Sequence, residues 1–182
     1  MIVLGVDPGT HCTGYAFLED GRNRATLAGT SPAAGSKSTA KGNPDRIRVL
    51  EYGVIRCPAK DALPLRLEKI HRELSALIDV YHPGQMALES IFFAKFPRSA
   101  LVLGHARGAI MVAAQARGIA VVEYAPRLVK QATVGSGSAS KERVASLIQS
   151  HLGLKQPPTP ADAADALAIA FCHLIQAKRA AG

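Results

Sequence analysis

The pattern of hydrophobic and polar positions changes once along the chain, from short apolar runs to apolar residues spaced by three and four. The first part holds three runs that are typical of strands, at Ile2–Val6, Thr13–Leu18 and Ile47–Cys57. Strand-like runs that follow one another directly favour antiparallel pairing, so we expect an antiparallel meander at the start of the fold.

The helical period begins at Pro64. From there to Tyr81 the apolar residues recur at three and four, and His82-Pro83-Gly84 ends the pattern. The same reasoning predicts two short strands, Gln85–Glu89 and Ile119–Tyr124, and three further helices, Pro97–Arg117, Ser140–Leu152 and Ala161–Lys178. This order predicts an α/β fold, a mixed sheet flanked by helices, in a single domain over residues 1–182.

A segment at about residues 20–46 interrupts the strands. It is rich in Gly, Ser, Ala, Thr, Lys and Arg and has few large apolar side chains, so we expect a mobile, basic insertion without a core of its own. Two interpretations stay open: a tolerated surface insertion, or an arm that contacts DNA.

Composition narrows the class of protein. The 182 residues are 48% hydrophobic, which argues against disorder, and no apolar run reaches the roughly 18 residues that cross a bilayer. The start lacks the features of a signal peptide, and the three cysteines are scattered, so we expect a cytoplasmic protein with reduced thiols and no membrane partner. The net charge of +8 favours a polyanionic partner such as nucleic acid.

Four carboxylates stand in apolar surroundings. Asp7 ends the run IVLGV, Glu89 ends MAL, and Asp162 and Asp165 lie three apart in the apolar helix PADAADALAIAF. Each has a structural alternative, since Asp7 could cap a turn and Asp162 could cap the helix. Glu123 is a comparable acid at a strand end, and spacing alone does not exclude it.

Buried carboxylates that meet without a counter-ion are unfavourable, and a hard divalent cation resolves the conflict. Mg²⁺ prefers oxygen ligands and is held by a few carboxylates together with substrate phosphates. Two such ions can activate a water and stabilise a leaving oxygen in phosphodiester cleavage. The acids therefore predict a Mg²⁺ site that serves phosphate chemistry.

Basic and aromatic residues add candidates for DNA contact. Lys130 and Lys141 flank a Gly/Ser loop that precedes a helix start and suits an anion, although an ordinary flexible loop explains it equally well. Phe92, in IFFAKF, could stack on unpaired bases or belong to the core. His11 could touch substrate, but a turn residue is the simpler interpretation.

Several motifs together resemble the RuvC-type Holliday junction resolvases of the ribonuclease-H-like superfamily. They are GVDPGT, ALES followed by FFAK, HARGA, EYAPRLVKQATVGSGSASK and DAADALAIA, in this order along nearly the whole chain. The resemblance implies a ribonuclease-H-like mixed five-stranded sheet flanked by helices. It also implies an endonuclease that cuts four-way DNA junctions by paired, symmetric nicks in recombination and repair, leaving a 5′-phosphate and a 3′-hydroxyl.

The resemblance implies roles for the same residues. Asp7, Glu89, Asp162 and Asp165 match an acidic tetrad that binds two Mg²⁺ ions per subunit, with Mn²⁺ as a substitute. Lys130 and Lys141 match basic positions that serve the scissile strand, and Phe92 matches an aromatic that meets junction bases. The helix at Pro97–Arg117 matches a homodimer contact, and the family works with the RuvA–RuvB branch-migration complex. The segment Gly21–Arg46 is longer than such proteins usually have, which leaves its role open.

Two other classes of function share part of the pattern. The actin-like kinases and ATPases also carry Asp-x-Gly-Thr in a first phosphate loop, but they need a duplicated domain for which this chain is too short. A basic junction-binding protein without activity is the non-enzymatic alternative, and it predicts tight DNA binding with no Mg²⁺-dependent nicking.

Overall fold

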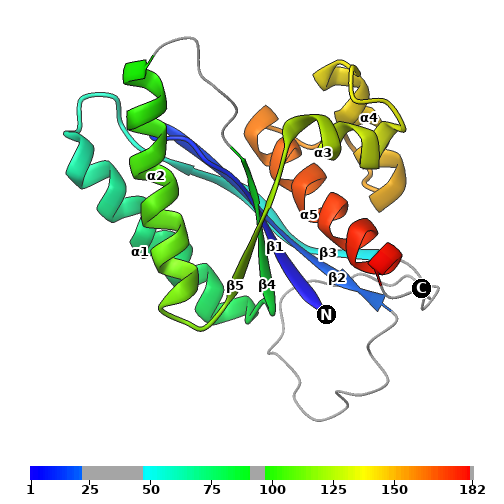
Figure 1. Cartoon of the computed structure of the whole chain (residues 1–182), viewed down its shortest axis with the longest axis horizontal. Helices are drawn as coiled ribbons and strands as arrows, with labels where there is room; N and C mark the ends of the chain where they lie inside the picture. Colours follow the sequence, from blue (N-terminus) through cyan, green and yellow to red (C-terminus); the bar gives the residue numbers. More distant parts are fainter. Residues whose placement is uncertain (22–46, 91–96, 181–182) are drawn as a thin grey trace.

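A computed structural model describes residues 1–21, 47–90 and 97–180 of the chain (Figure 1). Phe92 lies outside these ranges, and so does all of the predicted insertion except its first two residues. The expectations about both therefore stay predictions. None of the helices in the described ranges is long and apolar enough to cross a membrane. The three cysteines carry free thiols, with Cys57 and Cys172 buried and Cys12 half-buried.

Five strands form one mixed sheet in the order β3-β2-β1-β4-β5. Their bounds are Ile2–Asp7 for β1, Cys12–Asp20 for β2, Ile47–Arg56 for β3, Gln85–Glu89 for β4 and Ala120–Tyr124 for β5. β1, β2 and β3 pair antiparallel, as predicted, whereas β4 pairs parallel to both β1 and β5. The predicted mixed five-stranded sheet is therefore confirmed.

Helices cover both faces of the sheet (Figure 1). One face carries α1 (Leu63–Tyr81) and α2 (Pro97–Gln115), and the other carries α3 (Pro126–Val134), α4 (Lys141–Leu152) and α5 (Ala161–Ala180). The predicted cap of α4 is confirmed, because the Ser140 side chain accepts a hydrogen bond from the Arg143 backbone N–H at 3.3 Å. Helix α3 was not predicted from the sequence.

Alternation along the strands divides the core into two halves. Val3 and Ala87 point to the α5 side and pack in one apolar cluster with α3, α4 and α5. Leu4, Val6 and Leu88 point the other way and pack with α1 and α2. Residues of β1 and β4 that share the parity of Val3 and Ala87 therefore face α5.

A buried polar chain ties α5 to the parallel part of the sheet. His173 of α5 lies 2.9 Å from the Tyr124 hydroxyl through Nδ1 and 2.8 Å from Gln85 Oε1 through Nε2. Gln85 Oε1 can only accept, so Nε2 donates to it and the Tyr124 hydroxyl donates to Nδ1. Three elements are thereby fixed to one another well inside the molecule.

Candidate active site

Two of the predicted acids end neighbouring parallel strands. Val6 of β1 pairs with Leu88 of β4, so the next residues along each strand, Asp7 and Glu89, reach the same edge of the sheet. Both share the parity of the α5-facing residues, so their side chains leave the sheet on the α5 side. Strand register alone thus brings these two carboxylates together.

Two glycines let the start of α5 lie directly on the strands. A Cβ atom at Gly14, which pairs with Asp7, would lie only 2.0 Å from the backbone oxygen of Asp162. A Cβ atom at Gly5 would lie 2.3 Å from the backbone oxygen of Ala166. Real side chains never approach this closely, so only glycine permits the contact. The first turns of α5, with Asp162 and Asp165, are therefore held over the end of β1.

The raised pKa values of Asp7 and Glu89 indicate that the acids lie close together. The pKa of Asp7 is raised to about 7, first by burial and then by the charges of the other three acids, among which Glu89 contributes the most. Burial also raises the pKa of Glu89, and Asp165 adds to that rise. Like charges in a poorly hydrated site oppose ionisation. The structure therefore brings the four predicted acids to one edge, which is an energetically unfavourable arrangement for carboxylates alone.

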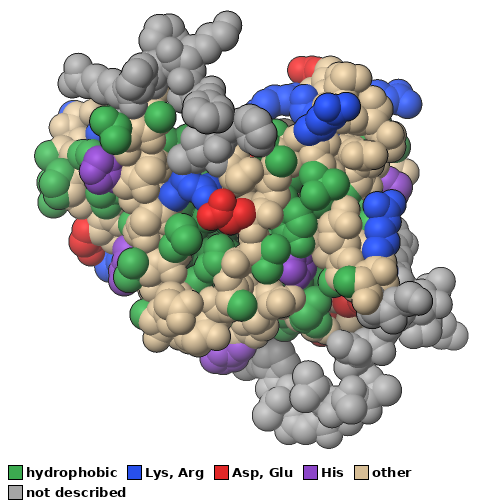
Figure 2. Space-filling view, viewed as in Figure 1, with side chains coloured by type: hydrophobic (Ala, Val, Ile, Leu, Met, Phe, Trp, Pro, Cys, Tyr) green, Lys and Arg blue, Asp and Glu red, His purple; other side chains and the backbone are tan. Residues whose placement is uncertain are grey.

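Basic groups partly compensate for this charge. Lys141, the first residue of α4, donates from Nζ to Asp165 Oδ2 at 2.6 Å, and this bond raises the pKa of the lysine. Lys130 of α3 lies close enough to lower the pKa of Glu89. Figure 2 shows Lys and Arg side chains over the α3–α4 region of this face. Both predicted lysines thus stand beside the acids, on the α5 side of the sheet.

Cys12 is a neighbour that sequence reasoning did not assign to the site. Its Sγ atom donates to Asp162 Oδ2 at 3.2 Å. Burial and this hydrogen bond raise the pKa of the thiol to about 11, so the group stays protonated and acts as a donor at neutral pH. The contact joins residues 150 positions apart, and no local pattern around Cys12 indicates it.

The donor set fits a hard divalent cation, although the acids do not form a closed cage. Within the described ranges, no three His, Cys, Asp or Glu side chains are grouped as metal ligands. Two of the four carboxylates instead face other partners, Asp165 the lysine and Asp162 the thiol. The carboxylate oxygens are the ligand type that Mg²⁺ prefers, and a cation would relieve the repulsion that raises the pKa of Asp7.

The alternative acid Glu123 lies on the other face of the sheet. Its parity in β5 is that of Val121, which packs on the α1–α2 side, and its carboxylate pairs with Arg107 of α2 at 2.8 Å. Arg107 is 8% exposed and also donates to the backbone oxygen of Glu89. The structure thus separates Glu123 from the four acids. The helix-cap alternative for Asp162 is wrong too, because α5 begins at Ala161 and Asp162 lies within its first turn.

Most of the chain is similar to proteins of one family. Residues 35–173 match the family model described as Crossover junction endodeoxyribonuclease RuvC. A protein of that name from Syntrophomonas wolfei subsp. wolfei is 41% identical over 96% of this chain and 88% of the relative's length.

Solved structures give the same result in three dimensions. The structure of Thermus thermophilus RuvC superposes with a TM-score of 0.79 at 32% identity, covering 99% of this chain and 97% of the other. A second, described as T. thermophilus RuvC in complex with Holliday junction substrate, has a TM-score of 0.79 at 30% identity, covering 98% and 96% of the two chains. The likeness therefore includes the strand ends and the helix that carry the acids.

Proposed function

This chain belongs to the RuvC family of crossover junction endodeoxyribonucleases, and we propose that it resolves four-way DNA junctions by Mg²⁺-dependent hydrolysis of phosphodiester bonds. The observation that carries the proposal is the meeting of four carboxylates at one sheet edge, with Asp7 at a pKa of about 7. The likeness to a RuvC structure in complex with Holliday junction substrate supports the choice of DNA.

The chain's own residues divide the work. Asp7, Glu89, Asp162 and Asp165 would hold two Mg²⁺ ions, which when bound activate water and stabilise the leaving oxygen. The rigid end of β1 and the glycine contacts under α5 fix where these carboxylates can be. Lys141 and Lys130 attract the phosphates of the scissile strand to the α5 side of the edge.

Two of the present contacts occupy oxygens that a cation could use. Asp165 Oδ2 accepts from the Lys141 ammonium and Asp162 Oδ2 accepts from the Cys12 thiol, whereas the second oxygen of each carboxylate takes no part in these bonds. Where a cation replaced the ammonium at Asp165 Oδ2, the lysine would stand next to the acids with a free donor. A backbone phosphate is the natural acceptor for that donor.

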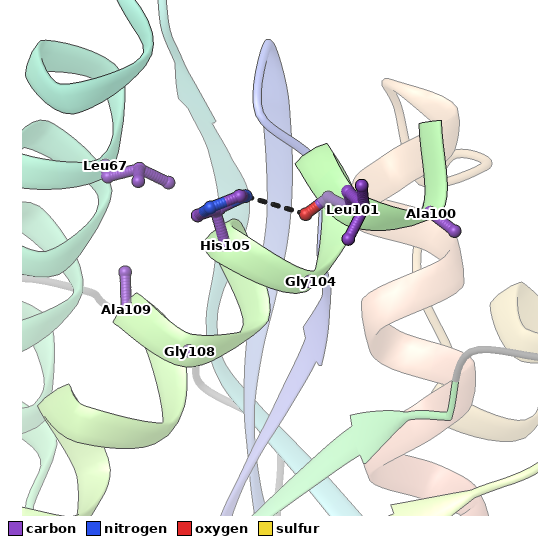
Figure 3. A pocket seen from close by; sticks show the side chains of 7 residues that line it. All are labelled: Leu67, Ala100, Leu101, Gly104, His105, Gly108 and Ala109. Atoms are coloured by element: carbon purple, nitrogen blue, oxygen red, sulfur yellow. Dashed lines mark hydrogen bonds between the residues drawn. The ribbon is translucent and has the colours of Figure 1, made fainter. Parts of the chain in front are cut away.

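The outer side of α2 supports a homodimer. Leu101 and Val112 are 67% and 58% exposed, and Cβ atoms added at Gly104 and Gly108 would meet nothing within 4 Å in the described part of the chain. A shallow apolar pocket lies here between α2 and α1, as Figure 3 shows; it is lined by Leu67, Ala100, Leu101, Gly104, His105, Gly108 and Ala109. We propose that a second copy covers this surface and sets two active sites against a two-fold junction.

The remaining partner and the location follow from family membership alone. Cooperation with the RuvA–RuvB complex is an expectation of that kind, and so is action in the cytoplasm, where chromosomal DNA of a bacterium lies.

The test uses a synthetic four-way junction and a linear duplex of the same sequence, with Mg²⁺ or EDTA. The unaltered protein should nick the junction with Mg²⁺ only, and Asp7→Asn should bind the junction without nicking it. A matched control is Asp79→Asn, an exposed acid of α1 that pairs with Arg117 far from the edge. Undiminished nicking by Asp7→Asn would refute the assignment, and a failure of the unaltered protein to cut any junction would refute the function.

A further inference from the structure

A second basic group lies at the tip of the β1–β2 turn, on the α1 side of the sheet. Arg66, in the first turn of α1, donates from Nη1 to Thr10 Oγ1 at 3.4 Å. The same Nη1 lies 3.2 and 2.9 Å from the two ring nitrogens of His11. Thr10 and His11 follow Asp7 by three and four residues, so the group adjoins the acidic edge.

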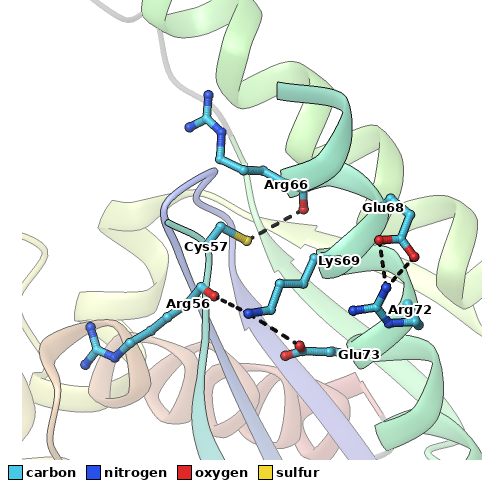
Figure 4. Close-up of polar contacts among 7 residues, drawn as sticks. All are labelled: Arg56, Cys57, Arg66, Glu68, Lys69, Arg72 and Glu73. Carbon is cyan, nitrogen blue, oxygen red and sulfur yellow. Dashed lines mark hydrogen bonds and ion pairs between the residues drawn. The ribbon is translucent and has the colours of Figure 1, made fainter. Parts of the chain in front are cut away.

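Arg66 lacks the counter-ion that its neighbours have. Figure 4 shows two ion pairs along the same helix, Lys69 with Glu73 and Arg72 with Glu68. The nitrogen–oxygen distance is 3.6 Å in the first pair and 2.6 Å in the second. No carboxylate pairs with Arg66 anywhere in the described ranges. Its charge therefore remains uncompensated next to an exposed histidine.

The guanidinium also leaves its best recognition edge unused. Arg66 Nε is buried and has no hydrogen-bond partner, and the bonds of this side chain to described residues all come from Nη1. The Nε–Nη2 edge of arginine is suited to two parallel bonds with a phosphate. A neutral imidazole accepts at one nitrogen only, so His11 keeps an N–H of its own for an acceptor. A buried donor without a partner calls for an explanation, and an anion or a water bound beside Arg66 would supply one.

The start of α1 strengthens the positive potential. Its N-cap residue, Ala62, makes no side-chain cap, and the first turn contains no acidic residue. Backbone N–H groups at such an end attract anions. The helix end adds to the field of Arg66 and is not itself the basis of the inference.

We propose that Arg66 and His11 bind a backbone phosphate of the DNA on the α1 side of the acidic edge, while Lys130 and Lys141 serve the α5 side. The strand would then be gripped by basic groups from both faces of the sheet, with Asp7 between them. A rotation of the Arg66 side chain that exposes its Nε–Nη2 edge to the phosphate would give the buried donor an acceptor. This inference rests on the proposed function, because it takes the ligand to be junction DNA.

The first experiment measures junction affinity across a series of salt concentrations, in EDTA, for the full-length protein. Each phosphate contact contributes close to one unit to the slope of log K against log salt. Arg66→Gln should weaken binding about tenfold and reduce that slope by about one. Arg72→Gln is the matched control, since it removes an exposed arginine of the same helix that already has a partner; it should change neither quantity.

Arg66→Lys distinguishes phosphate binding from a structural role. Lysine keeps the charge, so the slope should be close to that of the unaltered protein, with part of the affinity restored. If both variants lower the melting temperature and the affinity while the slope stays unchanged, Arg66 only braces the turn and the inference is wrong.

A second experiment locates the phosphate with junctions that carry one neutral methylphosphonate at a time. At one position near the cleaved bond, neutralisation should weaken binding of the unaltered protein and leave Arg66→Gln unaffected. If every position affects both proteins equally, the site does not exist. Nicking of the unmodified junction by the unaltered protein shows separately that the proposed function holds, so the two failures are distinguishable.

Discussion

The Lys141 ammonium lies 2.6 Å from Asp165 Oδ2, where it bonds directly to one of the clustered acids. The lysine side chain is 68% exposed, whereas that of Asp165 is 26% exposed, so the bond reaches from solvent into the edge of the site. A cation bound at this edge would therefore compete with the lysine for Asp165 Oδ2, and a displaced lysine would be free to meet a phosphate.

Lys141→Ala should lower the single-turnover rate of junction nicking on the order of a hundredfold, as the loss of one well-placed donor does. Stabilisation of the fold by Mg²⁺ should remain, because the carboxylates are intact. Lys155→Ala, at an exposed lysine beyond α4, is the control and should nick normally. If the rate is unchanged in Lys141→Ala as well as in Lys155→Ala, Lys141 has no part in cleavage.

Glu89→Gln and Glu123→Gln form a paired test of the sheet faces. The first removes an acid from the edge and should reduce nicking at least a thousandfold, while junction binding survives. The second breaks only the pair with Arg107 on the opposite face and should change nicking a few-fold. Quenched-flow or gel assays under single-turnover conditions measure both, and equal losses would contradict the separation of the two acids.

Stability without metal should depend on pH in a defined direction. The folded state holds the Asp7 proton more tightly than an unfolded aspartate of pKa 3.8, so this contribution is complete below about pH 4 and is lost as pH rises through about 7. The raised pKa of Glu89 acts in the same direction. Melting temperatures measured in EDTA should therefore decrease as the pH rises from about 4 to about 7.

Asp7→Asn is the control for that pH dependence, since it removes the titrating group with the largest shift among the four acids. The fall in melting temperature from pH 4 to 7 should be smaller in this variant, and saturating Mg²⁺ should reduce it in the unaltered protein. An equal fall in all three samples would place the titration elsewhere.

Gly14→Ala should destabilise the protein by about 1–3 kcal/mol, because the new methyl group must displace the first turn of α5. Nicking should fall more than stability explains, since Asp162 moves with that turn. Gly84→Ala is a matched control: the atoms nearest to its added Cβ lie 3.9 Å away. Chemical denaturation and a nicking assay on both variants measure the two effects.

The sequence allowed the strands and most helices to be predicted because their signals are local. β4 has the predicted bounds, Gln85–Glu89, and α1 differs from the prediction by one residue. Helix α3 was missed because it is short, although Pro126 in its first turn and Gly135 at its end, with φ of 78°, mark a helix nine residues long. That pair of signals could have found it.

The site was harder to predict because its decisive features are non-local. Asp7, Glu89, Asp162 and Asp165 could be chosen from their apolar surroundings, but Glu123 could be excluded only once strand parity was known. The Cys12–Asp162 and Arg66–His11 contacts join distant segments, and no spacing in the sequence indicates them. Their roles stay predictions until they are tested.

Alternation along β4 makes the chemistry sensitive to strand length. Leu88 and Glu89 differ by one position, yet one lies among apolar helices and the other among the acids. Deleting one residue early in β4 would turn the glutamate toward the α1–α2 side and place Ser90 where Glu89 now stands among the acids. A point substitution in β4 leaves every other side chain on its own face of the sheet. The loss of one residue moves each later side chain of the strand to the opposite face. Tolerance to changes of length is therefore expected in the connections between elements and not in this strand.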